Sequence, residues 1–212
     1  MIHIVDNFLP TDQLINLRDS IHHRYAITDK RQFPIGIEPL RVNYNNEYGN
    51  WRENCNFLGT ECVPAIEGIL NEFEKLNIRP VENWAVWFQY LLDNMYVSAH
   101  RDSDLRQSNM EHTYSALLYT SDWETKYGGQ FLAGSPVYSD STTGNSRKAA
   151  DLKIETVIDP IPNRLVIWSR DTWHAVSKIT ATDKNYVRSL FGSSWSSVKD
   201  RETVKLVFDR ST

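Results

Sequence analysis

The sequence is poor in cysteine and has no long apolar stretch. Its 212 residues include only two cysteines, Cys55 and Cys62, which form no metal-binding spacing and favour free thiols in a reducing compartment. No window reaches the roughly 20 apolar residues of a membrane span. The first residues lack the basic start and apolar run of a secretion signal. We therefore expect a soluble cytoplasmic protein without a membrane partner.

A strong excess of charge is also missing. Charged residues make up 24% of the chain and the net charge is −4, which argues against a disordered chain and against a surface that binds nucleic acid all over. A local basic patch stays open as an alternative. A hydrophobic fraction of 41% is enough to bury one sizeable core. We see no internal repeat, and we expect a single domain over 1–212.

Short β-rich runs dominate the chain after residue 80. Such density predicts an antiparallel sandwich or jelly roll instead of alternating α/β units. Turn signals separate eight candidate strands, at 84–92, 96–100, 112–120, 130–133, 152–158, 164–168, 172–176 and 186–195, and a ninth at 203–208.

The part of the chain before this core, 1–80, has mixed character. A β-branched run at 2–5 is followed by helical apolar spacing over about 12–23 and again over 64–76. We expect these helices to brace one outer face of the β core, which occupies 81–212. The segments 25–60 and 134–149 are expected to be loops that build the mouth of a substrate site.

Three residues carry the most specific chemical signal: His100, Asp102 and His174. Two imidazoles and one carboxylate are the ligand set of a non-haem Fe(II) site with open coordination positions. His100 ends an extended segment, so His100 and Asp102 point to the same side if the strand continues. With 6 histidines, about 0.4 His-x-Asp triplets arise by chance, so the triplet alone is weak. The alternative is that the histidines are ordinary core residues bonded to backbone.

An arginine stands among apolar strand residues further along, at Arg188 in Tyr186-Val187-Arg188-Ser189-Leu190-Phe191. A buried guanidinium needs an anionic partner, and it binds a carboxylate with two parallel hydrogen bonds. Arg188 is therefore a candidate for holding a carboxylate ligand. The alternatives are a surface arginine on the polar face of the strand, or the neighbouring Lys184 as the binding residue.

The order of these motifs resembles the Fe(II)- and 2-oxoglutarate-dependent oxygenases, and most closely their prolyl hydroxylase-like branch. The similarity runs over most of the chain. It rests on Ile4-Val5-Asp6-Asn7-Phe8-Leu9, Phe88-Gln89-Tyr90, Leu117 to Trp123, Tyr127-Gly128-Gly129-Gln130-Phe131, Leu165-Val166-Ile167-Trp168 before His174, and Arg188-Ser189-Leu190 before Trp195. The resemblance implies a double-stranded β-helix, the cupin-like jelly roll, of about eight antiparallel strands with N-terminal helices.

The resemblance also implies roles for individual residues. His100, Asp102 and His174 would bind Fe(II), and Arg188 would pair with the far carboxylate of 2-oxoglutarate. Tyr119 and Tyr90 would line the 2-oxoglutarate pocket. Arg188 follows His174 at a longer interval than is usual in the family, which keeps Lys184 open as an alternative.

The implied activity is a dioxygenase that couples oxidative decarboxylation of 2-oxoglutarate to hydroxylation, with a prolyl residue in a protein or peptide as the leading target. Its cofactors would be Fe(II), 2-oxoglutarate and O₂, with ascorbate as a stimulant. One alternative is the same mechanism acting on a small molecule or an alkylated nucleic acid. Another is a non-catalytic jelly-roll protein that only binds a metal.

Overall fold

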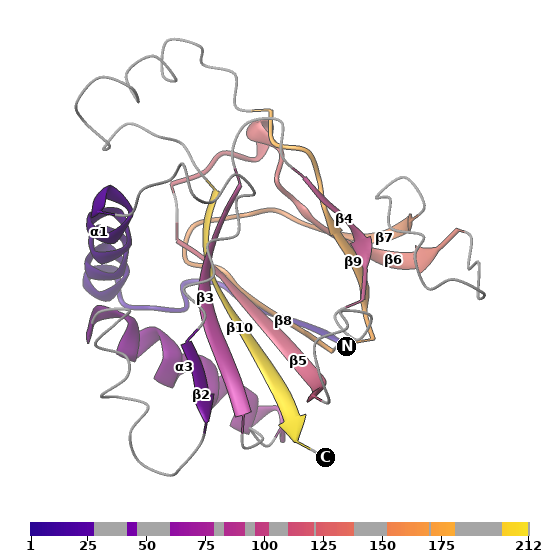
Figure 1. Ribbon diagram of the computed structural model, residues 1–212. Coiled ribbons are helices and arrows are strands. Elements are labelled where there is room, and N and C mark those ends of the chain that lie inside the picture. Colours follow the sequence, from indigo (N-terminus) through magenta and orange to yellow (C-terminus); the bar gives the residue numbers. More distant parts are fainter. Residues whose placement is uncertain are drawn as a thin grey trace.

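The structure is a computed structural model that describes residues 1–27, 42–45, 60–78, 83–91, 96–101, 110–120, 122–137, 152–169, 171–180 and 201–211 (Figure 1). Its α-helices are α1 (Thr11–Ile27) and α3 (Val63–Lys75), with short 3₁₀ helices η3 (Thr60–Cys62) and η5 (Thr125–Tyr127). Its strands are β1 (Ile2–Val5), β2 (Val42–Asn45), β3 (Asn83–Leu91), β4 (Val97–His100), β5 (Met110–Tyr119), β6 (Phe131–Pro136), β7 (Leu152–Ile158), β8 (Leu165–Ser169), β9 (Trp173–Val176) and β10 (Arg201–Ser211).

The described strands form two antiparallel sheets. The larger sheet has the strand order β1-β8-β5-β10-β3-β2, and the smaller one has the order β4-β9-β6-β7. No hydrogen-bonded ladder joins the two sheets within the described strands. Figure 1 shows the smaller sheet set apart from the larger one. The arrangement confirms the predicted fold class, an antiparallel jelly roll with N-terminal helices.

Two apolar clusters lie on opposite faces of the larger sheet, because side chains alternate along its strands. We call the first the inner cluster; it joins the two sheets and consists of Leu117, Tyr119, Phe131, Ala133, Ile158, Val166 and Trp168. We call the second the helix-side core; it includes Leu17, Ile66, Ile69, Phe73, Ala116, Leu118, Leu165 and Ile167. Neighbouring residues of β5 and β8 therefore serve different faces.

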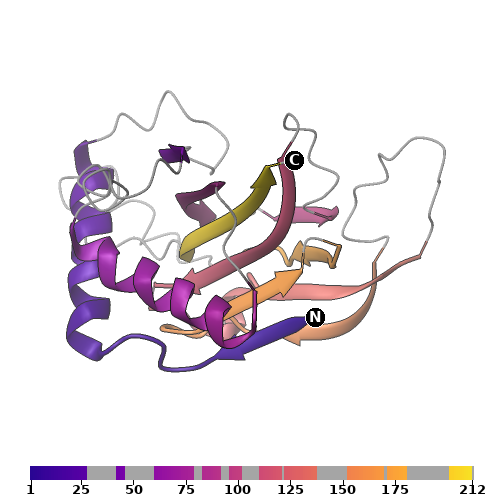
Figure 2. The same cartoon turned by 90° about the horizontal axis from the view of Figure 1, so that it is seen from below.

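Helices α1 and α3 cover the outer face of the larger sheet (Figure 2). Helix α3 buries Ala65, Ile66, Ile69 and Phe73, which is the one-sided pattern of a surface helix. Pro64 stands in its first turn, where a missing backbone N–H costs nothing. The prediction that the helices brace an outer sheet face is thus confirmed. No helix among the described residues combines the length and apolar character that crossing a membrane requires.

Strand β6 extends further than the sequence suggested. The loop expected from residue 134 begins later, because β6 continues to Pro136. Gly134, the first residue of that expected loop, permits a close contact: a Cβ on it would lie 1.9 Å from the carbonyl oxygen of Lys153. The candidate strand at 203–208 is confirmed by β10, whereas the candidate at 186–195 lies outside the described residues.

Gly128 turns the chain into β6. Its φ of 76° lies in the left-handed region, and a Cβ there would meet the carbonyl oxygen of Lys178 at 2.0 Å. The carbonyl of Gly128 accepts a hydrogen bond from Trp123 Nε1 at 2.9 Å. Trp123 is buried with Val176 and Ile179, so its role is packing.

Candidate metal centre

Strands β4 and β9 bring the two predicted histidine ligands side by side. The strands pair antiparallel, and His100 stands directly opposite His174 in their register. The centroids of the two imidazole rings are 4.3 Å apart, with the ring planes tilted by 50°. His174 is buried, with 3% of its surface exposed, and His100 is half-buried at the end of its strand.

A backbone carbonyl orients each imidazole through Nδ1. His100 Nδ1 lies 2.8 Å from the carbonyl oxygen of Ser98, and His174 Nδ1 lies 2.9 Å from that of Thr172. A carbonyl can only accept, so each Nδ1 carries the hydrogen and donates. In the neutral ring this leaves the lone pair on Nε2, the nitrogen that can ligate a metal. Such outer hydrogen bonds are typical of metal-binding histidines.

Aromatic residues of the inner cluster enclose His174. The Phe131 ring stacks on the imidazole at 5.3 Å with an interplanar angle of 13°, and the Trp168 ring lies 5.1 Å away. Phe131 comes from β6 and Trp168 from β8, so both sheets contribute to this wall. The wall fixes the imidazole and keeps water from that side of it.

The residues next to the two histidines form a second contact between β4 and β9. Arg101 follows His100, and its guanidinium carbon lies 5.1 Å from the ring centroid of Trp173, which precedes His174. This distance is within the range of a cation–π interaction. The contact therefore ties together the two strand ends that carry the histidines.

The other predicted site residues lie partly inside and partly outside the described residues. Tyr119 is completely buried in the inner cluster. Tyr90 belongs to β3, of which the structure describes the backbone. Asp102, Arg188 and Lys184 lie outside the described residues. Within the part that is described, no third metal-binding side chain joins the two histidines.

The groups that orient and enclose the histidines differ in how far the sequence predicts them. The carbonyls of Ser98 and Thr172 have no sequence signature, because every residue carries one. Phe131 and Trp168 do carry a signal. Each alternates with neighbours on the opposite face of its strand, so a register for β6 and β8 would have placed both toward the inner cluster.

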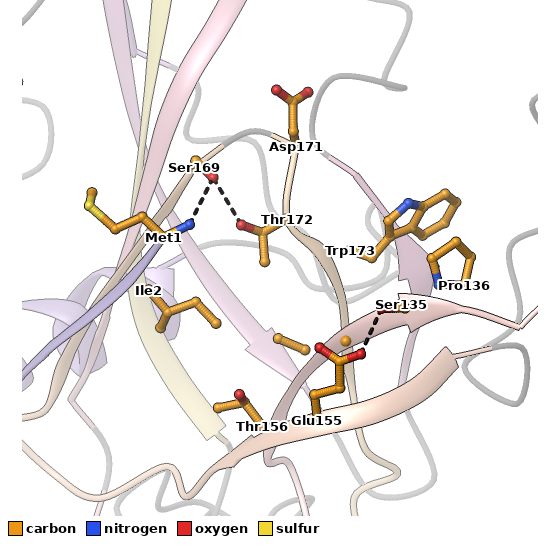
Figure 3. Close-up of a pocket in the computed structure, with 12 residues that line it drawn as sticks. Met1, Ile2, Ser135, Pro136, Glu155, Thr156, Ser169, Asp171, Thr172 and Trp173 are labelled. Atoms are coloured by element: carbon orange, nitrogen blue, oxygen red, sulfur yellow. Dashed lines mark hydrogen bonds between the residues drawn. The ribbon is translucent and has the colours of Figure 1, made fainter.

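A pocket with a volume of about 360 Å³ adjoins this centre (Figure 3). Ala133, one of its lining residues, is the register partner of His174, and Thr172, another, orients His174 through its carbonyl. The other lining residues are Met1, Ile2, Gly134, Ser135, Pro136, Glu155, Thr156, Ser169, Asp171 and Trp173.

Solved structures with a similar fold include two prolyl hydroxylases and one epimerase. A prolyl-4-hydroxylase from Pseudomonas putida has a TM-score of 0.58 and 15% identity, over 100% of this chain and 93% of that one. A Trichoplax adhaerens prolyl hydroxylase, in complex with a hypoxia inducible factor peptide fragment, has a TM-score of 0.55 and 14% identity, over 98% and 82%. The epimerase SnoN, in complex with Fe³⁺, alpha ketoglutarate and nogalamycin RO, has a TM-score of 0.59 and 10% identity, over 99% and 78%.

Sequence comparison identifies the family directly. No curated protein matches the chain. The profile of the 2OG-Fe(II) oxygenase superfamily matches residues 72–191, more than half of the 212 residues. The matched span contains both histidines of the β4–β9 pair, together with Asp102 and Arg188. The chain therefore belongs to the 2OG-Fe(II) oxygenase superfamily, whose members use Fe(II), 2-oxoglutarate and O₂.

Proposed function

We propose that this protein is a 2-oxoglutarate-dependent dioxygenase that hydroxylates a prolyl residue in a protein or peptide. The observation that carries the proposal is the pairing of His100 with His174, each with its Nδ1 held by a carbonyl. In this proposal the whole chain, 1–212, is one oxygenase domain, with 81–212 as its catalytic core.

The donor chemistry fits Fe(II). Nε2 of His100 and Nε2 of His174 would bind the ion, and the Asp102 carboxylate would be the third protein ligand. Imidazole suits iron, and one carboxylate offsets part of its charge while other coordination positions stay open. When bound, Fe(II) supplies the redox chemistry that divides O₂ between two products.

The remaining site residues would hold 2-oxoglutarate. Arg188 would pair with its far carboxylate in two parallel hydrogen bonds, which Lys184 cannot match as a point charge. Tyr119 and Tyr90 would add hydroxyl donors. Tyr119 is a candidate because its ring is fixed in the inner cluster beside Phe131 and Trp168, the aromatic residues that contact His174.

The reaction balances without a catalytic base. One oxygen atom of O₂ enters the substrate C–H bond as a hydroxyl group. The other oxidises 2-oxoglutarate, which loses CO₂ and becomes succinate. The protein binds and orients the reactants, and the aromatic wall around His174 excludes water from the centre.

A peptide substrate is favoured by the extent of the fold similarity to prolyl hydroxylases. The Pseudomonas putida enzyme is matched over 93% of its length, and the Trichoplax adhaerens enzyme was solved with a peptide. The second candidate is a small-molecule substrate, because the epimerase SnoN shares the fold to a similar degree. An alkylated nucleic acid and a non-catalytic metal-binding role are the remaining alternatives.

The test is succinate release from 2-oxoglutarate with Fe(II) and ascorbate, followed by mass spectrometry of a proline-containing peptide library. We expect stoichiometric succinate and a +16 Da product on proline. Arg188→Ala should raise the KM for 2-oxoglutarate, with Tyr119→Phe giving a smaller rise in the same direction.

Three outcomes would count against parts of this proposal. No succinate under any condition would reduce the protein to a metal-binding role. Succinate without any hydroxyproline, but with an oxidised small molecule or base, would move the substrate to the second class. A KM effect of Lys184→Ala in place of Arg188→Ala would reassign the carboxylate-binding residue.

A further inference from the structure

A β-bulge places one carboxylate at the edge of the smaller sheet. In the pairing of β6 with β7, Ala133 stands opposite Thr156 and Gly134 stands opposite Ile154, so Glu155 is the extra residue. A bulge redirects a side chain relative to the strand and is frequent beside active sites. The backbones of β6 and β7 approach each other closely here. A Cβ on Gly134 would lie 3.1 Å from the backbone nitrogen of Glu155 and 1.9 Å from the carbonyl oxygen of Lys153. Only glycine permits this bulge.

The side chain of Glu155 lines the pocket beside the candidate metal centre. Its Oε1 accepts a 2.7 Å hydrogen bond from Ser135 Oγ, from the residue that follows the glycine (Figure 3). Both residues line the pocket of about 360 Å³. No lysine or arginine of the described residues forms an ion pair with Glu155. Glu155 is exposed, and its second oxygen, Oε2, has no hydrogen-bond partner among the described residues, so this oxygen is available to a ligand.

Apolar and aromatic groups also line this pocket. Ile2 and Ala133 contribute aliphatic surface, while Trp173 and Pro136 contribute flat faces. A ligand group that fits such walls has an aliphatic body and ends in a hydrogen-bond donor. The volume is at the lower end of the range for ligand pockets, so it accommodates one side chain and not a large ligand.

Resting on the function proposed above, we propose that this pocket binds a basic side chain, lysyl or arginyl, of the peptide substrate close to the residue that is hydroxylated. The guanidinium or ammonium group would pair with Glu155, and the aliphatic stem would pack on Ile2 and the Trp173 face. Ala133 and Thr172 are shared between this pocket and the setting of His174, which puts the bound side chain next to the metal centre.

Other charges around the pocket modulate this preference. Asp171 stands at its rim and adds negative charge, although Figure 3 shows its carboxylate turned away from Glu155. Arg101 lies over the Trp173 ring at 5.1 Å and opposes a cation. The Met1 amino group donates to Ser169 Oγ at 3.4 Å on the far side. Glu155 is therefore the residue whose removal should matter most.

The first experiment measures binding without turnover, on the full chain loaded with Mn(II) and 2-oxoglutarate under argon. The probes are n-butylguanidinium and n-butylammonium, with n-butanol as the neutral analogue, followed by ligand-observed NMR. We expect both cations to bind about tenfold more tightly than butanol. Glu155→Gln should remove this difference, and Glu74→Gln, an exposed carboxylate on α3, should leave it unchanged. Equal binding of cations and butanol, or equal loss in the two variants, would overturn the proposal.

The second experiment uses turnover to test substrate preference. Proline-containing peptides that differ at one position, with Arg, Lys, acetyl-Lys or Glu, are compared by kcat/KM. We expect Arg and Lys peptides to be preferred about tenfold through KM, and Glu155→Lys should invert the preference toward Glu. A preference that is the same in the variant would refute the pocket assignment. Cation binding that depends on Glu155, but without hydroxylation of any peptide, would contradict the proposed function and leave the pocket's cation preference standing.

Discussion

Strands β5 and β8 present two surfaces that look alike in composition but differ in what they contact. On one side, Leu118 and Ile167 pack against helices α1 and α3 in the helix-side core. On the other side, Tyr119 and Trp168 belong to the inner cluster, and Trp168 contacts His174. Both surfaces are completely buried or nearly so, and the inner one contacts His174 of the β4–β9 pair.

The difference shows how one sheet separates stability from chemistry. A residue in the helix-side core can be changed for stability without touching the histidines, because the backbone of the larger sheet lies between them. The inner cluster affects both stability and metal binding, because its aromatic rings fill the space between the sheets and also contact the imidazole of His174. Substitutions on the two faces should therefore give different mixtures of lost stability and lost activity.

The largest expected effect comes from His174→Ala. It removes one of the two paired imidazoles, so we expect succinate formation to fall below detection and Fe(II) affinity to fall by at least about 100-fold. His3→Gln is a matched control, because His3 lies on β1 beside Glu72 at 3.6 Å and away from this centre. Isothermal titration with Mn(II) and a succinate assay measure both effects. If His174→Ala binds Mn(II) as tightly as the wild type, His174 is not a metal ligand.

The second effect tests the helix-covered face. Leu118→Ala opens a cavity in the helix-side core, where Leu118 is 0% exposed, and should lower the free energy of unfolding by about 2–5 kcal/mol. Mn(II) affinity at a temperature where the variant is fully folded should stay within about twofold of wild type. Urea unfolding with parallel titration checks both values. A large loss of affinity in the folded variant would show that the two faces are coupled.

The sequence predicted this division only in part. Alternation of apolar residues predicted the strands, and helical spacing predicted α3 to within one residue at each end. The pairing of His100 with His174 follows from the register of β4 and β9, which depends on contacts between residues far apart in the chain. The sequence supplied the residue types, and tertiary structure supplied their distance.

The β-bulge at Glu155 shows why the full length of β6 could not be predicted from the sequence. Glycine followed by serine and proline is an ordinary loop signal, which predicts a loop over 134–149. The same glycine is what lets β6 continue past Lys153 O to Pro136. A local pattern cannot distinguish a glycine that ends a strand from one that lets another backbone approach closely.

A smaller effect is expected from Trp173→Leu, which changes the contact between Trp173 and Arg101 next to the two histidines. Loss of the ring removes the cation–π contact with Arg101 and should weaken Mn(II) binding about twofold to fivefold. Substituting Trp173 is cleaner than substituting Arg101, because removing a positive charge beside a divalent ion would raise its affinity. Tyr96→Leu is the control, an aromatic residue before β4 that is 58% exposed. Equal affinities in the two variants would mean that the contact does not position the strand ends.

The smallest effect concerns neither face but the edge where β1 meets β8. Arg164 binds Asp6 through Nε at 2.6 Å and through a second hydrogen bond at 3.0 Å, and this bonding lowers the pKa of the Asp6 carboxyl from its usual range. A lowered folded-state pKa stabilises the folded protein at pH values above the unfolded pKa of about 4, and this contribution is lost as the pH falls through the folded pKa.

Asp6 is 54% exposed, so Asp6→Asn should lower the free energy of unfolding by no more than about 1 kcal/mol at pH 7 and by less at pH 3. Urea unfolding at both pH values measures it. A larger loss at pH 3 than at pH 7 would contradict the sign, and a loss of several kcal/mol would mean that this edge stabilises the fold as much as the helix-side core does.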